Sequence, residues 1–302
     1  MRKNAFIPGG SFFKGNTHTH TNVSDGRLSS EQIISAYKTM GYNFLAITDH
    51  GVYSDYRDYD DEKFIMLPGV EIGMSAENGK HLHVVGLGKP GENKFLHLKR
   101  FGEESDAFTC LQDIVDLLAK NGNYAVIAHP SWSRLEFSDI ANADNIFGME
   151  IYNHLCEKGY ASGEAGAYYE WLCSRGKAPY CFSVDDNHAD EGMIGGFIMV
   201  KAEKLDAISL YDAMGAGSFY ASYGPLIYDF YLEDDVAHIS CSPVERINLV
   251  TNEIYTVQSI SDSDGGLTDA GFKLGFRPST KLVRVIITDS RGRKAYSQPI
   301  KI

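Results

Sequence analysis

Residues 12–20 read Phe-Phe-Lys-Gly-Asn-Thr-His-Thr-His, which is typical of a buried β-strand that ends in two histidines. Side chains alternate across a strand, so the spacing of His18 and His20 places both imidazole rings on one face. Two imidazoles on one face are suited to chelating a single metal ion. The same pattern, a strand that ends in potential metal ligands, recurs along the chain and decides the predicted fold.

Six further strands carry residues of the same chemical kind at or near their ends. They contain Thr48-Asp49-His50, Gly69-Val70-Glu71, His81-Leu82-His83, Ala128-His129-Pro130, Gly148-Met149-Glu150 and Asp185-Asp186-Asn187-His188. A lone histidine at a strand end is more often structural than a ligand, but this succession argues against coincidence. In parallel α/β barrels the carboxyl ends of the strands form one rim, where active sites are built. Histidine and carboxylate suit zinc, manganese or iron(II), so the sequence predicts a metal centre at this rim.

Helical stretches separate these strands. Ser29 begins a helix predicted to reach Met40, and Asp106–Lys120 carries Leu111, Ile114, Val115 and Leu118 at helical spacing. Strands separated by helices predict parallel pairing. From Gly224–Pro225 onward only β-type runs follow. We therefore expect an α/β barrel domain over residues 1–223 and a small antiparallel β domain over residues 224–302.

Composition limits the classes of function. The chain has 302 residues and a formal net charge of −12, so a surface that wraps a long nucleic-acid duplex or binds an anionic membrane is not expected. No apolar run approaches the roughly 20 residues that span a bilayer. The N-terminal residues 1–13 lack the apolar core of a secretory signal. The five cysteines form no CxxC pair, so we expect reduced thiols in a cytoplasmic protein.

The motifs together resemble the PHP (polymerase and histidinol phosphatase) superfamily of metal-dependent phosphoesterases. The resemblance covers about residues 12–223. It rests on His18-Thr-His20 with Ser24-Asp25-Gly26, Thr48-Asp49-His50, Ala128-His129-Pro130 and Asp186-Asn-His188, with Glu71 and His83 in matching order. It implies a distorted seven-stranded (β/α) barrel, TIM-like in kind, and the all-β tail looks like the appendage that some stand-alone members carry.

The resemblance also implies two or three divalent ions, which would be zinc, manganese or iron. One ion would be held by His18, His20, Glu71 and Asp186, a second by Glu71, His83 and His129, and a third by Asp25, His50 and His188. Asp25 stands where some members have histidine. Members often have an arginine directly after the His-Pro pair, whereas Ser131 and Trp132 follow here and the nearest arginine is Arg134.

We therefore predict an enzyme that hydrolyses a phosphomonoester or an oligonucleotide end through a hydroxide bridging two metals. A nucleotide, a nucleoside bisphosphate and a sugar phosphate all remain open as the small phosphorylated substrate, and so does the oligomeric state. Arg134, His154 and Lys158 are candidate phosphate contacts, and Asp185 is a candidate partner that orients a metal ligand. The alternatives are a metal-dependent amidohydrolase acting on C–N bonds and a non-catalytic metal- or ligand-binding module.

Overall fold

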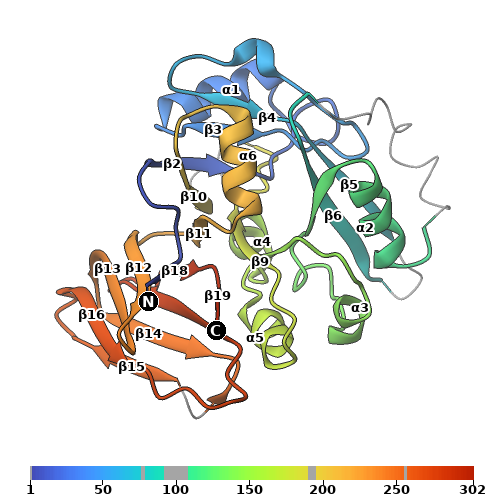
Figure 1. The fold of residues 1–302 in the computed structure, drawn as a ribbon. Helices are drawn as coiled ribbons and strands as arrows, with labels where there is room; N and C mark the ends of the chain where they lie inside the picture. Colours follow the sequence, from blue (N-terminus) through green and yellow to red (C-terminus); the bar gives the residue numbers. More distant parts are fainter. Residues whose placement is uncertain (1, 76–78, 92–107, 190–194, 255–256) are drawn as a thin grey trace.

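In the computed structural model, which describes residues 2–75, 79–91, 108–189, 195–254 and 257–302, the chain forms three β-sheets with helices packed against them (Figure 1). The helices are α1 (Ser30–Thr39), α2 (Leu111–Lys120), α3 (Phe137–Ala141), α4 (His154–Tyr160), α5 (Gly166–Ser174) and α6 (Ala207–Gly215), with a 3₁₀ helix, η1 (Arg57–Tyr59). Residues 106 and 107 of the predicted Asp106–Lys120 helix lie outside the described residues.

The first sheet has five strands in the order in which they occur along the chain. They are β5 (Gly69–Ser75), β6 (His81–Gly88), β7 (Asn123–Ile127), β8 (Gly148–Asn153) and β9 (Tyr180–Val184). β7, β8 and β9 pair in parallel, as predicted, but β5, β6 and β7 pair antiparallel. The prediction of parallel pairing was therefore wrong for this part of the chain. No described helix separates β5 from β6, so their connection can be a hairpin rather than a crossover. β6 and β7 pair antiparallel although α2 lies between them, so a helix in the connection did not dictate parallel pairing here.

The second sheet combines strands from the N-terminal and the C-terminal parts of the sequence. Its order is β15-β14-β17-β18-β11-β10-β2-β3-β4, with β19 beside β17. The strands are β2 (Ser11–Asn16), β3 (Phe44–Ala46), β4 (Ile65–Leu67), β10 (Phe197–Ala202), β11 (Phe219–Ser222), β14 (Arg246–Thr251), β15 (Gln258–Ser261), β17 (Leu282–Thr288), β18 (Lys294–Ser297) and β19 (Ile300–Lys301). β2, β3 and β4 pair in parallel, whereas β10 runs antiparallel to β2.

Single bridges connect these two sheets near the strand ends. Thr19 pairs with Asn187 and His50 pairs with Glu71, both in parallel orientation. Pro68 interrupts the chain between β4 and β5, and proline has no N–H to continue a ladder. Among the described residues, the strands therefore form a mixed α/β arrangement of two bridged sheets, and the hydrogen bonding does not close into one continuous barrel.

The third sheet belongs to the all-β part of the chain. Its order is β1 (Lys3–Asn4), β12 (Ile227–Glu233), β13 (Val236–Val244) and β16 (Leu267–Lys273). All of its pairs are antiparallel. Both chain ends lie in this part of the molecule (Figure 1). The predicted boundary at residues 223 and 224 falls just after β11, which pairs with β18, so one sheet passes through the boundary. The division into two domains at this point stays a prediction.

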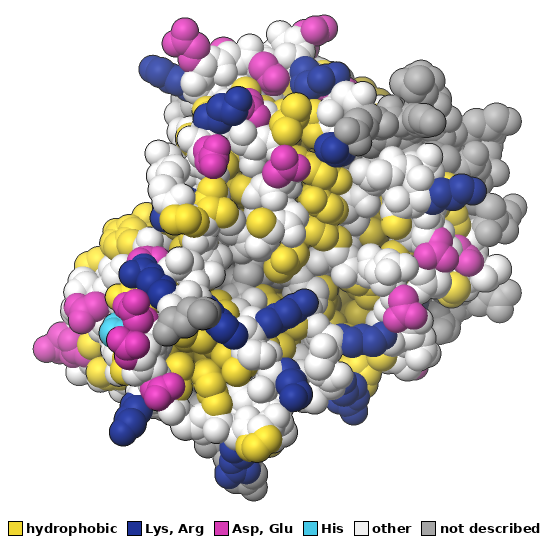
Figure 2. Space-filling view, in the orientation of Figure 1, with side chains coloured by type: hydrophobic (Ala, Val, Ile, Leu, Met, Phe, Trp, Pro, Cys, Tyr) yellow, Lys and Arg dark blue, Asp and Glu magenta, His cyan; other side chains and the backbone are white. Residues whose placement is uncertain are grey.

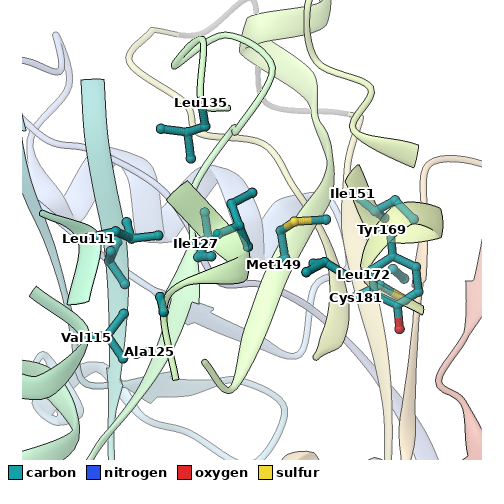
Figure 3. Packing of buried hydrophobic residues seen from close by; sticks show 14 of the residues in the cluster. Leu111, Val115, Ala125, Ile127, Leu135, Met149, Ile151, Tyr169, Leu172 and Cys181 are labelled. Atoms are coloured by element: carbon teal, nitrogen blue, oxygen red, sulfur yellow. The ribbon is translucent and has the colours of Figure 1, made fainter. Parts of the chain in front are cut away.

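Helix α2 packs its apolar face on the five-stranded sheet. Leu111, Ile114, Val115 and Leu118 are buried, which confirms the face predicted from their spacing. Figure 3 shows the labelled side chains of this cluster, in which Leu111 and Val115 of α2 lie toward Ala125 and Ile127 of β7. This core holds β6, β7 and β8 in place below the strand ends that carry the histidines.

Helix α1 begins with the predicted cap. The Ser29 side chain accepts a hydrogen bond from the Gln32 backbone N–H, and the Gln32 side chain accepts one from the Ser29 N–H. The helix ends before Gly41, whose φ of +74° suits glycine. In the part of the chain that the structure describes, no helix is both long and apolar enough to cross a membrane.

We predict that Ile114→Ala lowers the free energy of unfolding by about 2–5 kcal/mol, because Ile114 is fully buried in this core and its loss leaves a cavity. Urea denaturation would measure the change. Ile208→Ala in α6 is the matched control, since Ile208 is 55% exposed and should lose less than about 1 kcal/mol. Equal losses in the two variants would contradict the assignment of this face to the core.

Candidate metal centre

The nine residues predicted as metal ligands gather at one place in the fold. His18 and His20 follow β2, His50 follows β3, Glu71 lies in β5 and His83 in β6. The remaining four lie in the loops after strands: Asp25 after β2, His129 after β7, and Asp186 and His188 after β9. Seven of the nine line a cavity of about 630 Å³, and His18 and His20 are fully buried beside it. The structure therefore brings the nine residues together, and their role as metal ligands stays a prediction.

Glu71 lies at the centre of the cluster and uses its two carboxylate oxygens differently. Oε1 lies 2.9 Å from His83 Nδ1 and 3.2 Å from His129 Nε2. Oε2 faces the other histidines, with His20 Nε2 at 3.1 Å, His50 Nδ1 at 3.1 Å and His18 Nε2 at 3.3 Å. One side chain thus joins two sets of imidazoles, an arrangement in which a carboxylate can bridge two cations.

The contacts around Asp186 fit a bound cation. Nε2 of His18 and Nε2 of His20 lie 3.1 Å apart, and Asp186 Oδ1 lies 3.2 and 3.3 Å from them. Within the described residues, this buried oxygen accepts no hydrogen bond. His18 donates its other ring nitrogen, Nδ1, to Glu150 Oε1 at 2.6 Å. When the His18 ring carries a single proton, on Nδ1, its Nε2 directs a lone pair toward the Asp186 carboxylate. A cation between Nε2 and that carboxylate would stabilise this arrangement.

A third set of side chains lies at the cavity mouth. Asp25 Oδ2 lies 3.2 Å from His188 Nε2 and 3.6 Å from His50 Nε2. His188 donates from Nδ1 to the Asp186 carbonyl oxygen at 2.9 Å, so its Nε2 is turned toward Asp25. The Asp25 side chain is half exposed, unlike the buried carboxylates of Glu71 and Asp186.

Four overlapping groups in this cluster could each hold a metal ion, since one ligand atom from each member lies within 4.8 Å of the others. They are His18-His20-Asp186, His18-Glu71-His129, His50-Glu71-His83 and His20-Asp25-His50-His188. The first group belongs to the first predicted ligand set, and the last contains the complete third set together with His20. His83 and His129 both face Oε1 of Glu71, which agrees with the second predicted ligand set. The two histidines nevertheless belong to different groups of the four just named.

The pKa values follow from opposite charges held together in a buried site. Burial opposes charge on His20, but the nearby carboxylates of Asp186 and Glu71 outweigh it and raise its pKa to about 9. Burial likewise opposes ionisation of Glu71, yet the surrounding histidines hold its pKa well below the usual range. For His83 burial dominates, so its pKa is lowered despite the neighbouring Glu71.

Several side chains outside the predicted set hold the ligand candidates in position. Glu150 binds His18 Nδ1 with Oε1, and its Oε2 accepts the His129 backbone N–H at 2.8 Å and Asn153 Nδ2 at 2.9 Å. Asn153 also donates to Asp186 Oδ2 at 3.0 Å. The sequence shows Glu150 as a carboxylate in an apolar strand. Its position in the sequence does not show whether it binds a metal or orients the metal ligands.

Asp49 holds the loop that presents Asp25. Its oxygens accept hydrogen bonds from the Thr21 N–H and hydroxyl, both at 2.7 Å, and from the Ser24 hydroxyl at 2.8 Å. The same loop needs a glycine at Gly26, because a Cβ there would lie 2.7 Å from the carbonyl group of His20. The Thr-Asp-His and Ser-Asp-Gly motifs are thus joined physically, with Asp49 in a structural role.

Backbone strain marks two of the ligand candidates. His129 has a φ of +24° and Asp186 a φ of +53°, in the left-handed region that non-glycine residues seldom adopt. Such conformations cost on the order of 1–3 kcal/mol each and cluster at functional sites. Here, where β7 and β9 end, His129 Nε2 lies 3.2 Å from Glu71 Oε1 and 3.8 Å from Asp186 Oδ2.

The predicted phosphate contacts lie outside the cavity lining. Arg134 lines a neighbouring cavity, the His154 ring is buried and lies 3.0 Å from the Tyr152 hydroxyl, and Lys158 is exposed. Among the described lining residues of the main cavity, Arg27 is the one lysine or arginine. It directly follows the Ser24-Asp25-Gly26 motif, and that adjacency was the signal that could have found it. The roles of Arg134, His154 and Lys158 stay predictions.

Asp185 does not touch a ligand candidate through its carboxylate in any described contact. Its oxygens accept hydrogen bonds from the Tyr37 hydroxyl at 2.9 Å and the Gly196 N–H at 2.8 Å. Burial raises its pKa to about 8. Tyr37 also binds Asn16, which accepts the Asp185 backbone N–H, so Asp185 fixes the backbone behind the cluster.

Comparison with solved structures identifies the class of fold. The chain is similar to a two-domain protein containing a predicted PHP-like metal-dependent phosphoesterase from Bacteroides vulgatus, with a TM-score of 0.52 and 15% identity over 98% of this chain and 96% of that one. This likeness shows that the chain shares the fold of that two-domain protein along nearly its whole length.

Two further matches are more distant. An amidohydrolase from Chromobacterium violaceum matches with a TM-score of 0.40 and 17% identity, over 59% of this chain and 89% of that one. A lesion-specific endonuclease from Pyrococcus furiosus matches with a TM-score of 0.43 and 11% identity, over 69% and 57%. No protein-family model and no curated protein matches the chain.

We predict that Glu150→Gln weakens zinc binding by about 10- to 100-fold, because the neutral amide no longer holds the His18 ring with a charged acceptor. Competition with a chromogenic chelator would measure the affinity. Glu136→Gln is the control, since Glu136 is exposed and pairs with Lys80 away from the cluster. Unchanged affinity in Glu150→Gln would contradict the positioning role.

Proposed function

We propose that this protein is a metal-dependent phosphoesterase that hydrolyses a small phosphomonoester. The observation that carries the proposal is Glu71, whose two carboxylate oxygens face separate sets of histidines. The PHP-like fold over nearly the whole chain supports it as well. The residues fit two or three divalent ions, held by the three ligand sets that the motifs imply.

Bound divalent ions would supply Lewis-acid activation of water at neutral pH and neutralise charge on the phosphoryl oxygens. The protein's own residues hold those ions and position the substrate. Glu150 and Asn153 fix His18, His129 and Asp186, and the strained backbone at His129 and Asp186 turns their side chains inward. No described side chain needs to act as nucleophile, and we assign no general acid.

Arg27 is the side chain that we propose for binding the substrate phosphate. It lines the same cavity as His188 and Asp25, and its backbone N–H donates to the His188 carbonyl oxygen at 2.9 Å. A guanidinium there can bind two oxygens of a phosphate at once. It would take the role for which the sequence offered Arg134, which lines the neighbouring cavity.

The cavity suits a small molecule rather than a long duplex. Its volume of about 630 Å³ lies within the range of small-ligand sites. On the face shown in Figure 2, acidic and basic side chains are mixed in the upper part, and several separate lysines and arginines lie in the lower middle of the view. The cavity volume and the net charge of −12 favour a small phosphorylated substrate, and an oligonucleotide end remains within the proposal.

We predict that Glu71→Ala lowers phosphate release by more than about a hundredfold, because both sets of histidines lose their shared carboxylate. The assay is phosphate release from a panel of phosphomonoesters, after EDTA treatment and reloading with Mn²⁺ or Zn²⁺. EDTA should remove activity and the metal should restore it in the unchanged protein alone. Full turnover by Glu71→Ala, or ammonia release from amides without phosphate release, would overturn the proposal.

A second prediction separates the two arginines. Arg27→Ala should raise the KM for a phosphomonoester by on the order of tenfold, because a charge-assisted contact to phosphate is lost. Arg134→Ala, which replaces the arginine five residues after His129, should have a smaller effect, since Arg134 lines the other cavity. The reverse ranking in steady-state kinetics would restore Arg134 as the phosphate contact.

A further inference from the structure

Trp132 is held next to the metal candidates by a tight turn. The Ser133 N–H donates to the His129 carbonyl oxygen at 3.0 Å, and the Leu135 N–H donates to the Pro130 carbonyl oxygen at 3.1 Å. The indole ring therefore lies close to the cluster, with its centroid 4.9 Å from that of His129 and 6.3 Å from that of His83. This turn places a large aromatic ring where it lines the cavity.

A second aromatic ring lies beside it. Tyr160 ends α4, and its ring centroid lies 6.0 Å from that of Trp132 in an edge-to-face arrangement. Tyr160 lines both the main cavity and the neighbouring one, as Trp132 does. Its side chain is 63% exposed, so most of its ring is not covered by the described protein. A large exposed aromatic at a cavity mouth is available to contact a ligand.

The cavity has a polar part, formed by the metal candidates and Arg27, and an apolar part. Apart from the metal candidates, Arg27 and the polar Asn187, the lining beyond the two aromatic rings consists of Leu28, Leu155, Cys156 and Ala189, which offer apolar surface. A sugar hydroxyl placed against this surface and the two aromatic rings would lose hydrogen bonds to water without gaining equivalent partners. A planar aromatic ring would instead cover apolar area and gain a stacking contact.

We propose that the substrate is a phosphate ester that carries a planar aromatic ring, a nucleobase or an aryl group, which packs against Trp132 and Tyr160 while its phosphate lies at the histidine cluster. The inference rests on the proposed phosphoesterase function and names the substrate class for the same cavity. Trp132 is then a specificity-determining residue, and Tyr160 forms the outer part of the same surface.

Binding can be measured apart from turnover because the chain has two tryptophans. Trp171 lies in α5, where its ring stacks on Phe137, and it does not line the cavity. Trp171→Phe therefore leaves Trp132 as the fluorescent reporter. The zinc-loaded variant is titrated with three phosphonates that resist hydrolysis: the analogue of AMP, benzylphosphonate as the analogue of phenyl phosphate, and the analogue of ribose 5-phosphate.

We expect the two ring-bearing phosphonates to change the Trp132 emission and to bind on the order of tenfold more tightly than the ribose compound. The adenosine and benzyl compounds distinguish a nucleobase from a simple aryl group. Equal affinity for all three would overturn this inference while leaving the phosphoesterase proposal intact. Failure of all three to bind, together with no phosphate release from any ester, would overturn both.

Turnover supplies the second test. In the unchanged protein, kcat/KM for AMP or phenyl phosphate should exceed that for ribose 5-phosphate, and Trp132→Ala should reduce this ratio by on the order of tenfold. Trp132→Phe should restore most of the ratio, because phenylalanine keeps an aromatic face. Circular dichroism and zinc affinity check that the variants keep the fold and the cluster. A purely structural role for Trp132 would lower turnover of all esters alike, and an unchanged ratio would contradict the inference.

Discussion

The structure depends on one buried carboxylate among imidazoles. Glu71 is almost fully buried, and isolated charge in such a place is costly unless it is paired. Five histidines contact its two oxygens, and they come from strands or strand ends that lie far apart in the sequence. Satisfying this one side chain therefore requires the carboxyl ends of β2, β3 and β7 and the first residues of β5 and β6 to meet at the same place.

The candidate site could be predicted well because its chemistry is tied to strand ends. Alternation along a strand puts His18 and His20 on one face, and the carboxyl ends of neighbouring parallel strands meet. The first argument does not depend on which strands pair, whereas the second holds only for parallel neighbours. Glu71 and His83 instead lie near the beginnings of the antiparallel strands β5 and β6, and the cross-strand pairing of these strands brings them to the same place. The cluster was therefore found even though β5, β6 and β7 pair antiparallel and the bridged sheets do not close into a continuous barrel.

What escaped prediction depends on tertiary contacts that no local pattern encodes. A carboxylate such as Glu150 has the same sequence signal whether it binds a metal or orients His18, and only the fold decides between these roles. Likewise Arg27 and Arg134 both follow a motif residue closely, but the path of each loop determines which of them lines the main cavity. The apolar face of α2 needed no such information, because helical periodicity alone defines it.

The continuity of the large sheet has a consequence for how the molecule forms. β2, which leads into His18 and His20, pairs with β10, β10 pairs with β11, and β11 pairs with β18 near the end of the sequence. During synthesis β18 emerges long after His18, His20 and β11, so one edge of β11 stays unpaired until β18 is available. Such long-range pairing slows folding, because the entropy of closing a long loop is lost before the stabilising contacts between the strands form. Until the final strands dock, the nascent chain exposes a sheet edge on which another chain could pair.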